Sequence, residues 1–365
     1  MNDSLLYQIA LKKLKGIGSS RAKKLVAYCG GVESIFSASK KELAAIPGIG
    51  TKVVSNLDFG LALTQAETEL KFVERHNIQT HFFLDKSYPK RLQHCEDGPL
   101  LLYSRGEIQA NQQKCVAIIG TRNCTDYGKQ NTEKLVEALS KHDCLIVSGL
   151  AYGIDVIAHR AAVQHKLQTI GVLGHGLDRL YPSQNQSTAD KMLENGGLMT
   201  EFESETKPDR ENFPQRNRIV AGMVDAVIVV ESAMKGGSLI TAKLAADYNR
   251  DVFAFPGTID AEFSKGCNHL IKTHQANLID SVRDIEYLLN WDEDKTKKNV
   301  QKQLFVELNS DEQKVMDVLS KLGKESLDLL SLKSEMPTSK VSMILLELEF
   351  KGLVATLPGK IFKAI

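Results

Sequence analysis

Glycine-rich turns that also carry hydroxyl groups and cations recur through the middle of this sequence. Backbone amides at such turns, and at the helix N-termini that follow them, bind phosphate oxygens, while Arg and Lys side chains neutralise the phosphate charge. One turn binds one phosphate or pyrophosphate, so a series of turns predicts a groove for a strand of nucleic acid. The candidate contacts are Gly120, Thr121, Arg122, Ser148, Gly149, Gly153, Gly174, Gly176, Arg216, Arg218, Lys235, Gly237, Ser238 and Thr241.

These turns need a scaffold that brings them to one place, and apolar runs between them provide it. Each run is nearly continuous rather than alternating, as in strands that are buried on both faces, and helical patterns lie between the runs. The sequence therefore predicts an α/β domain with a Rossmann-like, doubly wound parallel sheet, in which the carboxyl ends of the strands share one edge. The predicted strands are Cys115–Ile119, Cys144–Val147, Thr169–Leu173, Leu198–Glu201, Ala226–Val230 and Val252–Phe255.

The sequence motifs of the common phosphate-containing cofactors are missing from this domain. Gly120 is followed by Thr-Arg-Asn, not by the second glycine of a dinucleotide-binding Gly-x-Gly-x-x-Gly turn, and the segment 174–176 lacks the third glycine. Gly128-Lys129 is not followed by the Ser or Thr of a Walker A loop. The sequence contains no Cys-x-x-Cys pair, so it gives no indication of a zinc site. We expect no cofactor, no metal and no catalytic residue.

Three polar or aromatic residues near these turns allow more than one interpretation. Asp155 and His159 are four residues apart on a predicted helix, so they share a face. Hydrogen bonding that orders the preceding loop is the favoured role for both, ahead of a DNA contact or catalysis. Tyr181, before Pro182, is either a platform for base stacking or a core residue, and a lone aromatic residue is more often core.

Arg216 and Arg218 flank an asparagine in a stretch that begins with Phe213 and Pro214. An arginine here could form a structural ion pair with Glu203 or Glu231. It could equally clamp a phosphate, since the guanidinium fork matches phosphate oxygens. We expect one residue in each role.

The segments on either side of the predicted sheet differ in character from it. The first segment repeats a Gly-Ile-Gly loop before a helical pattern, and the last has helices closed by a small hairpin. The predicted divisions are a helix-hairpin-helix or SAM-like domain at 1–65, a connecting segment at 66–110, the Rossmann-like domain at 111–290, a charged linker at 291–307 and a winged helix at 308–365.

Both flanking domains are of kinds that can bind nucleic acid. In the helix-hairpin-helix segment, Lys15, Arg21 and Lys52 are the cations nearest to the two glycine loops, although helix packing is the favoured role of these loops. The predicted recognition helix of the winged helix, from Ser339, is poor in the Arg, Asn and Gln residues that contact bases. Protein contact is therefore favoured for the winged helix, ahead of DNA.

Composition and charge restrict the class of protein further. The chain of 365 residues is 42% hydrophobic and 25% charged, which is typical of a globular protein. A net charge of +1 argues against coating nucleic acid by bulk charge and confines binding to a local groove. No apolar run approaches the roughly 20 residues of a membrane helix, no signal-peptide pattern is found, and the cysteines are scattered. We expect a cytoplasmic protein without membrane contact.

The ordered motifs of the central segment resemble those of the DNA processing protein A family (DprA, also called Smf), and the flanking segments are similar to its extended architecture. The resemblance implies a non-enzymatic single-stranded DNA-binding protein of natural transformation. Such a protein protects incoming DNA, acts as a homodimer and helps to load the RecA recombinase. It also implies that Arg122 contacts the strand. The motifs are Val116–Arg122, Val147–His159, Val172–Pro182, Phe213–Gly222, Gly237–Ala242 and Val252–Gly257.

The sequence departs from this family after Tyr181-Pro182, where a lysine often follows. Residues 183–187 are Ser-Gln-Asn-Gln-Ser, so the contact is lost, moves to Lys191 or is supplied by Lys235. The alternative function is a nucleotide-handling hydrolase, because phosphoribohydrolases use the same edge of a related sheet. The segment 235–241 lacks the catalytic glutamate of their Pro-Gly-Gly-x-Gly-Thr-x-x-Glu loop, which argues against hydrolysis.

Overall fold

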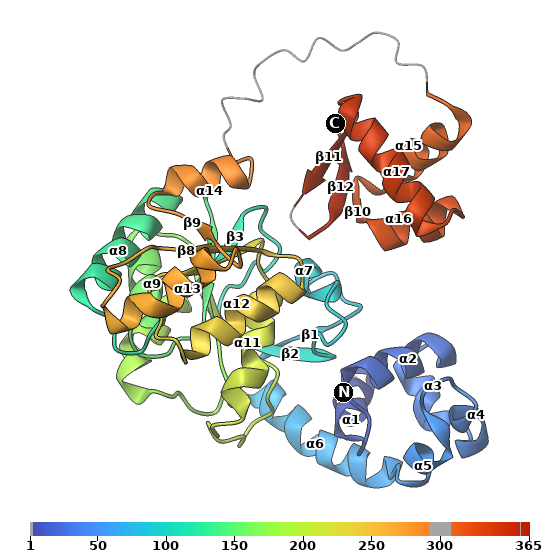
Figure 1. Cartoon of the computed structure of the whole chain (residues 1–365). Helices are drawn as coiled ribbons and strands as arrows, with labels where there is room; N and C mark the ends of the chain where they lie inside the picture. The colour runs from blue at the N-terminus through green and yellow to red at the C-terminus, as the bar shows by residue number, and fades with distance from the viewer. Residues whose placement is uncertain (1–2, 292–307, 358) are drawn as a thin grey trace.

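A large sheet forms the centre of the protein, in a computed structural model that describes residues 3–291, 308–357 and 359–365. Its strands are β1 (Gln79–Phe82), β2 (Leu101–Arg105), β3 (Cys115–Ile119), β4 (Leu145–Ser148), β5 (Thr169–Val172), β6 (Gly196–Thr200), β7 (Ala226–Val229), β8 (Asp251–Ala254) and β9 (Asn277–Leu278). The nine strands lie in the order β1-β2-β6-β5-β4-β3-β7-β8-β9. Figure 1 shows the sheet domain with its helices around the strands. From β6 to β9 all neighbours are parallel, whereas β1 and β2 add an antiparallel edge.

The predicted doubly wound parallel sheet is confirmed: β3 has the predicted ends, and the other predicted strands are present with ends that differ slightly. The sheet has three strands besides these six: β2, which overlaps the apolar run Leu100–Tyr103, and two that were not predicted, β1 and β9. Strand β1 lies in the segment 66–110, expected only to connect domains, and pairs with β2. Strand β9 is two residues long with both side chains exposed, so it leaves no apolar run in the sequence.

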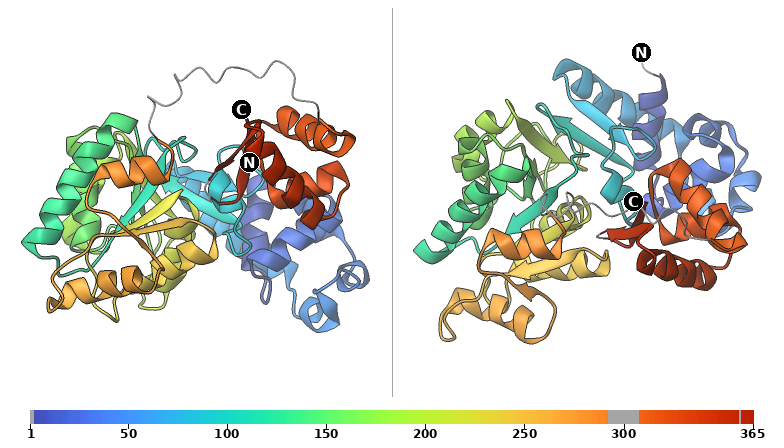
Figure 2. Two further views of the ribbon diagram at one scale, coloured as in Figure 1. Left: turned by 45° about the horizontal axis from the view of Figure 1, so that its top comes forward. Right: turned by 90° about the horizontal axis from the view of Figure 1, so that it is seen from above.

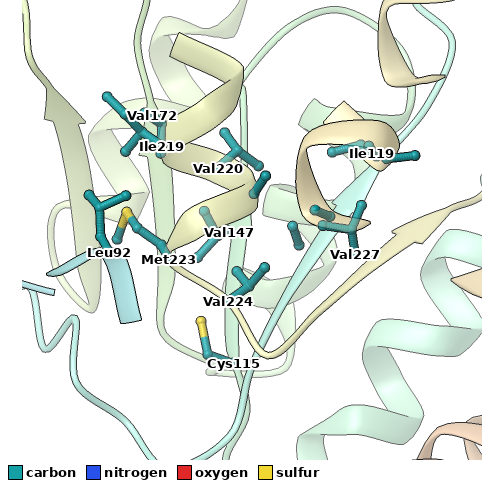
Figure 3. Close-up of a cluster of buried hydrophobic side chains, with 14 of the residues drawn as sticks. Leu92, Cys115, Ile119, Val147, Val172, Ile219, Val220, Met223, Val224 and Val227 are labelled. Atoms are coloured by element: carbon teal, nitrogen blue, oxygen red, sulfur yellow. The ribbon is translucent and has the colours of Figure 1, made fainter. Parts of the chain in front are cut away.

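Helices cover both faces of the sheet. Alternate residues of β3 enter different cores: Val116 and Ile118 pack toward α8, α9 and α14, and Ala117 packs toward α11, α12 and α13. Figure 3 shows the second core, where Ile219 of α11 lies beside Val172 of the sheet. The helices are α7 (Lys90–Gln93), α8 (Asp126–Leu139), α9 (Ile154–Gln164), α10 (Gln186–Met192), α11 (Asn212–Gly222), α12 (Gly237–Asp247), α13 (Lys265–Lys272) and α14 (Val282–Leu288), with 3-10 turns at Ser140–His142, Ser183–Asn185 and Glu262–Ser264.

The strand order places a crevice at the carboxyl edge of the sheet. From β3 the chain builds outward through β4 and β5 to β6, then crosses back to place β7 on the other side of β3. The loops after β3 and β7 therefore diverge, and ligands of doubly wound sheets bind at such switch points.

Short helices form the N-terminal part of the chain: α1 (Asp3–Lys13), α2 (Ser19–Cys29), α3 (Val32–Ser37), α4 (Lys40–Ala44), α5 (Gly50–Ser55) and α6 (Phe59–Arg75). Gly16 and Gly48 adopt φ of 79° and 84°, which explains the need for glycine in both Gly-Ile-Gly loops. Their core continues into β1 and β2 through Phe82 and Leu101. Figure 2 shows these helices (blue) beside β1 and β2, at one edge of the sheet. Helix α6 runs across the boundary predicted at residue 65.

The C-terminal residues form the predicted winged helix around a core of their own. Its elements are α15 (Ser310–Leu322), β10 (Lys324–Ser326), α16 (Leu327–Ser334), α17 (Thr338–Phe350), β11 (Val354–Leu357) and β12 (Ile361–Ala364), with strand order β10-β12-β11. Of the predicted linker, Trp291 is buried beside α14 in the sheet domain, and 292–307 lie outside the described residues. No helix in the described part of the chain is long and apolar enough to cross a membrane.

Candidate nucleic-acid interface

One hollow of about 770 Å³ lies beyond the carboxyl ends of β3, β4 and β7. Its walls are the turns that follow these strands and the first turns of α11 and α12. It brings together eight of the predicted contacts, at the switch point of the sheet: Gly120, Thr121, Arg122, Gly149, Arg216, Gly237, Ser238 and Thr241.

Arg122 presents an unpaired cation in this hollow. The backbone N–H of Thr121 donates to the carbonyl of Glu231 at 2.8 Å, which fixes the turn. The guanidinium carbon of Arg122 lies 5.6 Å from the centre of the Phe213 ring. Arg122 is exposed and has no hydrogen bond or ion pair to any residue that the structure describes. The stacked guanidinium therefore keeps its N–H donors available to a phosphate.

Arg216, in contrast, is only 5% exposed and is engaged with the protein. Its Nη1 donates to the carbonyl of Gly149 at 2.7 Å and to the carbonyl of Val172. The neighbouring Asp155 accepts from the backbone N–H of Gly149 at 3.1 Å and of Ala151 at 3.5 Å. Burial lowers the pKa of Arg216 to about 10, and Asp155 opposes that shift. The side chain is therefore charged at neutral pH and ties β4 and β5 to α11.

Arg218 forms the structural ion pair of the two arginines, but with an unpredicted partner. Its Nη2 contacts the carboxylate of Glu201 and its Nη1 donates to the carbonyl of Asp97. The expected partners are engaged elsewhere, because Glu203 pairs with Lys13 and Glu231 accepts from the backbone N–H of Thr125. The prediction of an ion pair with Glu203 or Glu231 is therefore wrong. Arg218 does not line the hollow.

Other predicted contacts lie behind the wall of the hollow or beside it. Ser148 is buried and donates to the carbonyl of Ile118 at 2.6 Å. A Cβ atom on Gly153 would lie 2.2 Å from the carbonyl oxygen of Thr121, so this glycine allows two loops to touch. Of the remaining candidates, Gly174 packs under the Phe213 ring, Gly176 lies against the backbone of Glu203, and Lys235 is exposed next to Gly236 of the wall.

The structure separates the roles of Asp155 and His159. Asp155 orders the loop after β4, as expected, because its carboxylate accepts hydrogen bonds from the backbone N–H groups of Gly149 and Ala151. His159 makes no hydrogen bond to that loop: its Nδ1 lies 2.7 Å from Oγ1 of Thr169, so it joins α9 to β5. Burial, assisted by the charge of Arg216, lowers the pKa of His159 to about 3, so the imidazole is neutral at physiological pH.

Three side chains of the hollow were missed or misjudged from the sequence. Tyr181 is 44% exposed and lines the wall, 6.0 Å from the Phe213 ring, so its assignment to the core is wrong. The ring of Phe213 lies against the guanidinium of Arg122, a role that the sequence analysis did not predict for it. Arg210 is exposed and also lines the wall, whereas neither Lys191 nor Lys235 does.

The signal for Arg210 and Phe213 was weak, because their stretch contains no glycine. The only distinctive feature of this stretch was Phe213, an aromatic residue directly before Pro214 in the first turn of α11. Among the described residues, no group of three or more His, Cys, Asp or Glu side chains is placed to hold a metal ion.

Comparisons with known proteins agree with this geometry. Residues 79–290 match the model of the DNA recombination-mediator protein A family, 303–360 match the DprA winged helix domain, and 9–59 match a SAM-like helix-hairpin-helix tandem. The chain is 41% identical over 279 residues to the DNA processing protein DprA of Streptococcus pneumoniae, covering 76% of this chain and 96% of that protein. It is 33% identical over 321 residues to the protein Smf of Escherichia coli, covering 82% and 84%.

Solved structures give the same result. The structure of DprA from Streptococcus pneumoniae matches with a TM-score of 0.67 and 34% identity, covering 77% of this chain and 97% of that one. A structure of DNA processing protein A from Helicobacter pylori, whose description concerns its single-stranded DNA binding mode, matches with a TM-score of 0.54 and 33% identity, covering 59% and 96%.

Proposed function

This chain belongs to the DNA recombination-mediator protein A family, and from that premise we propose that it binds single-stranded DNA in the hollow beyond β3, β4 and β7. We propose further that it protects the strand during natural transformation in the cytoplasm, that it acts as a homodimer, and that it helps to load RecA without catalysing a reaction. The observation that carries the DNA-binding proposal is Arg122, an unpaired guanidinium stacked on Phe213 within a wall of glycine turns.

The hollow offers separate partners to the phosphates and to the bases. Arg122 and Arg210 supply cations, and the first turn of α12 after Gly236 supplies backbone amides. Tyr181 and Phe213 supply two aromatic rings at the same wall. Stacking on these rings needs unpaired bases, because the bases of a duplex are already stacked on each other. This combination favours a single strand over a duplex and tolerates any sequence.

The charges in the wall also bear on the alternative, a nucleotide hydrolase. Asp155 is the only carboxylate among the described residues that line the hollow. Its carboxylate already accepts hydrogen bonds from two backbone N–H groups and interacts with the positive charge of Arg216. A general base must reach the substrate, so this wall offers poor support for hydrolysis and better support for binding alone. The relative from Helicobacter pylori, described for its binding of single-stranded DNA, supports the same choice.

Titration of labelled oligo-dT at two salt concentrations tests the proposal. Replacing Arg122 by alanine should weaken binding about tenfold to a hundredfold, because a charge-assisted hydrogen bond contributes about 1.5–3 kcal/mol. It should also reduce the salt slope by about one. Lys129→Ala is the matched control, since Lys129 is exposed on α8 but absent from the wall.

Equal affinity and equal salt slope for R122A and wild type would contradict binding in this hollow. Incubation of the wild-type protein with nucleoside monophosphates separates the alternative function. Release of free base from them would favour the hydrolase, and intact nucleotides are expected.

A further inference from the structure

Tyr152 is an exposed aromatic residue that borders the hollow beyond β3, β4 and β7 without lining it. It is 39% exposed and directly follows Ala151, which lines the hollow. Its hydroxyl lies 2.7 Å from Oε1 of Gln184 and donates to it. Gln184 in turn comes three residues after Tyr181, which also lines the hollow. Tyr152 is therefore joined on two sides to residues of the wall.

The loop after β4 holds Tyr152 in this outward position. Leu150 adopts φ of 54°, a left-handed conformation that a leucine adopts only at an energetic cost. Its side chain is fully buried and packs in a core with Val156, which compensates for that cost. On the other side of the ring, Gly153 lies against the carbonyl of Thr121. The backbone is thus fixed on both sides of Tyr152, and the loop presents the ring to solvent.

The turn that bonds to Tyr152 is tied to the same loop. Nδ2 of Asn185 donates to the carbonyl of Leu150 at 2.9 Å and to that of Ala151 at 3.4 Å. Asn185 is only 2% exposed, so these bonds are shielded from water. Tyr152 and the turn 183–185 therefore form an ordered rim of the hollow. A side chain that is already ordered loses less conformational entropy when a ligand binds to it.

This rim offers an aromatic ring but no charge. Residues 183–187 are Ser-Gln-Asn-Gln-Ser, so a phosphate finds no cation in this segment. The hydroxyl of Tyr152 already has a partner in Gln184, which leaves the ring as the group that a ligand can contact. Aromatic rings stack on bases of every kind, provided that the base is unpaired. The chemistry of the rim therefore fits a single nucleic-acid base.

We propose that a single strand continues out of the hollow past Tyr181 and stacks one further base on Tyr152. The inference rests on the proposed binding of single-stranded DNA in the hollow, and it adds a subsite that acts through stacking rather than charge. Phe213 and Tyr181 in the wall and Tyr152 at the rim then give successive bases separate aromatic partners.

An abasic scan tests this subsite. The probe is the shortest labelled oligo-dT that the wild-type protein binds with full affinity, so that it cannot shift its register, with one base removed at each position in turn. Tyr152→Ala should bind the intact strand about fivefold to 150-fold more weakly, because stacking contributes about 1–3 kcal/mol per base. It should also become insensitive to base removal at one position where the wild-type protein is sensitive.

Further variants separate the ring from its hydrogen bond. Tyr152→Phe should restore most of the affinity that Tyr152→Ala loses, because it keeps the ring. Gln184→Ala removes only the partner of the hydroxyl and should lose several-fold less affinity than Tyr152→Ala. The salt slope of Tyr152→Ala should equal that of the wild type, since a stacked base neutralises no phosphate. Tyr28→Ala is the matched control, because Tyr28 is exposed on α2 and outside the wall.

Two outcomes would overturn the subsite. One is an affinity and an abasic profile of Y152A that match the wild type. The other is an equal loss from Y152A and Q184A, which would assign Tyr152 to the support of the loop. Failure of the proposed function is distinguishable from both, because R122A would then bind as tightly as the wild type, whereas failure of the subsite leaves the effect of R122A unchanged.

Discussion

The hollow at the sheet edge and the outer face of α17 are both places where a protein of this architecture could hold nucleic acid, but their chemistry is opposite. The hollow has an unpaired guanidinium on an aromatic ring, glycine turns and a single occupied carboxylate. The outer face of α17 has Met343, Leu346 and Phe350, and its Lys340 already has a partner. The difference indicates that accessible cations and backbone amides, rather than the fold alone, favour the binding of DNA at one of these surfaces.

A second difference lies beneath these surfaces. The hollow rests on a buried polar scaffold, in which Arg216 and Asp155 hold the ends of β4 and β5. The exposed face of α17 rests on an apolar core. Substitutions beneath the hollow should therefore affect stability and binding together, whereas those on α17 should leave both the stability and the DNA site intact.

The largest expected effect is on stability, from Arg216→Ala. Removing the guanidinium leaves Asp155 buried without its counter-charge and the carbonyls of Gly149 and Val172 without their donor. Breaking a buried pair in this way costs about 3–5 kcal/mol. Urea unfolding followed by the fluorescence of Trp291, the single tryptophan of the chain, reports on the sheet domain that contains it.

The matched change on the other surface is Lys340→Ala. It removes a half-exposed ion pair with Asp311 and should lower the free energy of unfolding by less than about 1 kcal/mol, measured by circular dichroism. Equal losses from R216A and K340A would remove the distinction between a buried scaffold and a surface contact.

The next effect is on DNA binding, from one aromatic residue in each region. Phe213→Leu keeps apolar volume over Gly174 but removes the ring that faces Tyr181 and Arg122. Base stacking contributes about 1–3 kcal/mol per base, so affinity for oligo-dT should fall by about fivefold to 150-fold. Phe350→Leu should not change it. Fluorescence anisotropy at one salt concentration measures both, and a loss of affinity in F350L would place DNA on α17.

The sequence predicts the scaffold well because its signals are local. Strand β3 has the ends predicted for it, since a strand buried on both faces must be continuously apolar. The sequence also identifies the glycines of the site, because their positions leave no room for a side chain. A Cβ atom on Gly149 would lie 2.4 Å from Nη1 of Arg216, so only glycine fits there.

The roles of individual cations could not be predicted, because they depend on the phase of a helix and on distant partners. Arg216 and Arg218 are two residues apart on α11, which rotates their side chains about 200° around the helix axis. One therefore faces β5 and the hollow, and the other faces Glu201 and Asp97. Arg210 joins the wall only after the long segment between β6 and α11 folds back over it, and nothing local in the sequence marks that path.

The smallest expected effect is a pH dependence that belongs to the sheet domain alone. Burial lowers the pKa of His159 to about 3 in the folded protein, whereas an unfolded histidine titrates near 6.5. Between these values the unfolded chain binds a proton that the folded chain does not, so this contribution is complete above about pH 6.5 and is lost as the pH falls toward 3. Residues 308–365 contain no histidine, so the winged helix has no such loss.

From pH 7 to pH 5 the wild-type sheet domain should lose up to about 2 kcal/mol more than the His159→Gln variant, measured by Trp291 fluorescence in urea. The comparison with H159Q isolates this residue, because His81 and His175, whose pKa values burial also lowers, contribute to both proteins equally. The same loss in both proteins would mean that His159 titrates normally. In that case the hydrogen bond between His159 and Thr169 would have to be assigned to a charged imidazole.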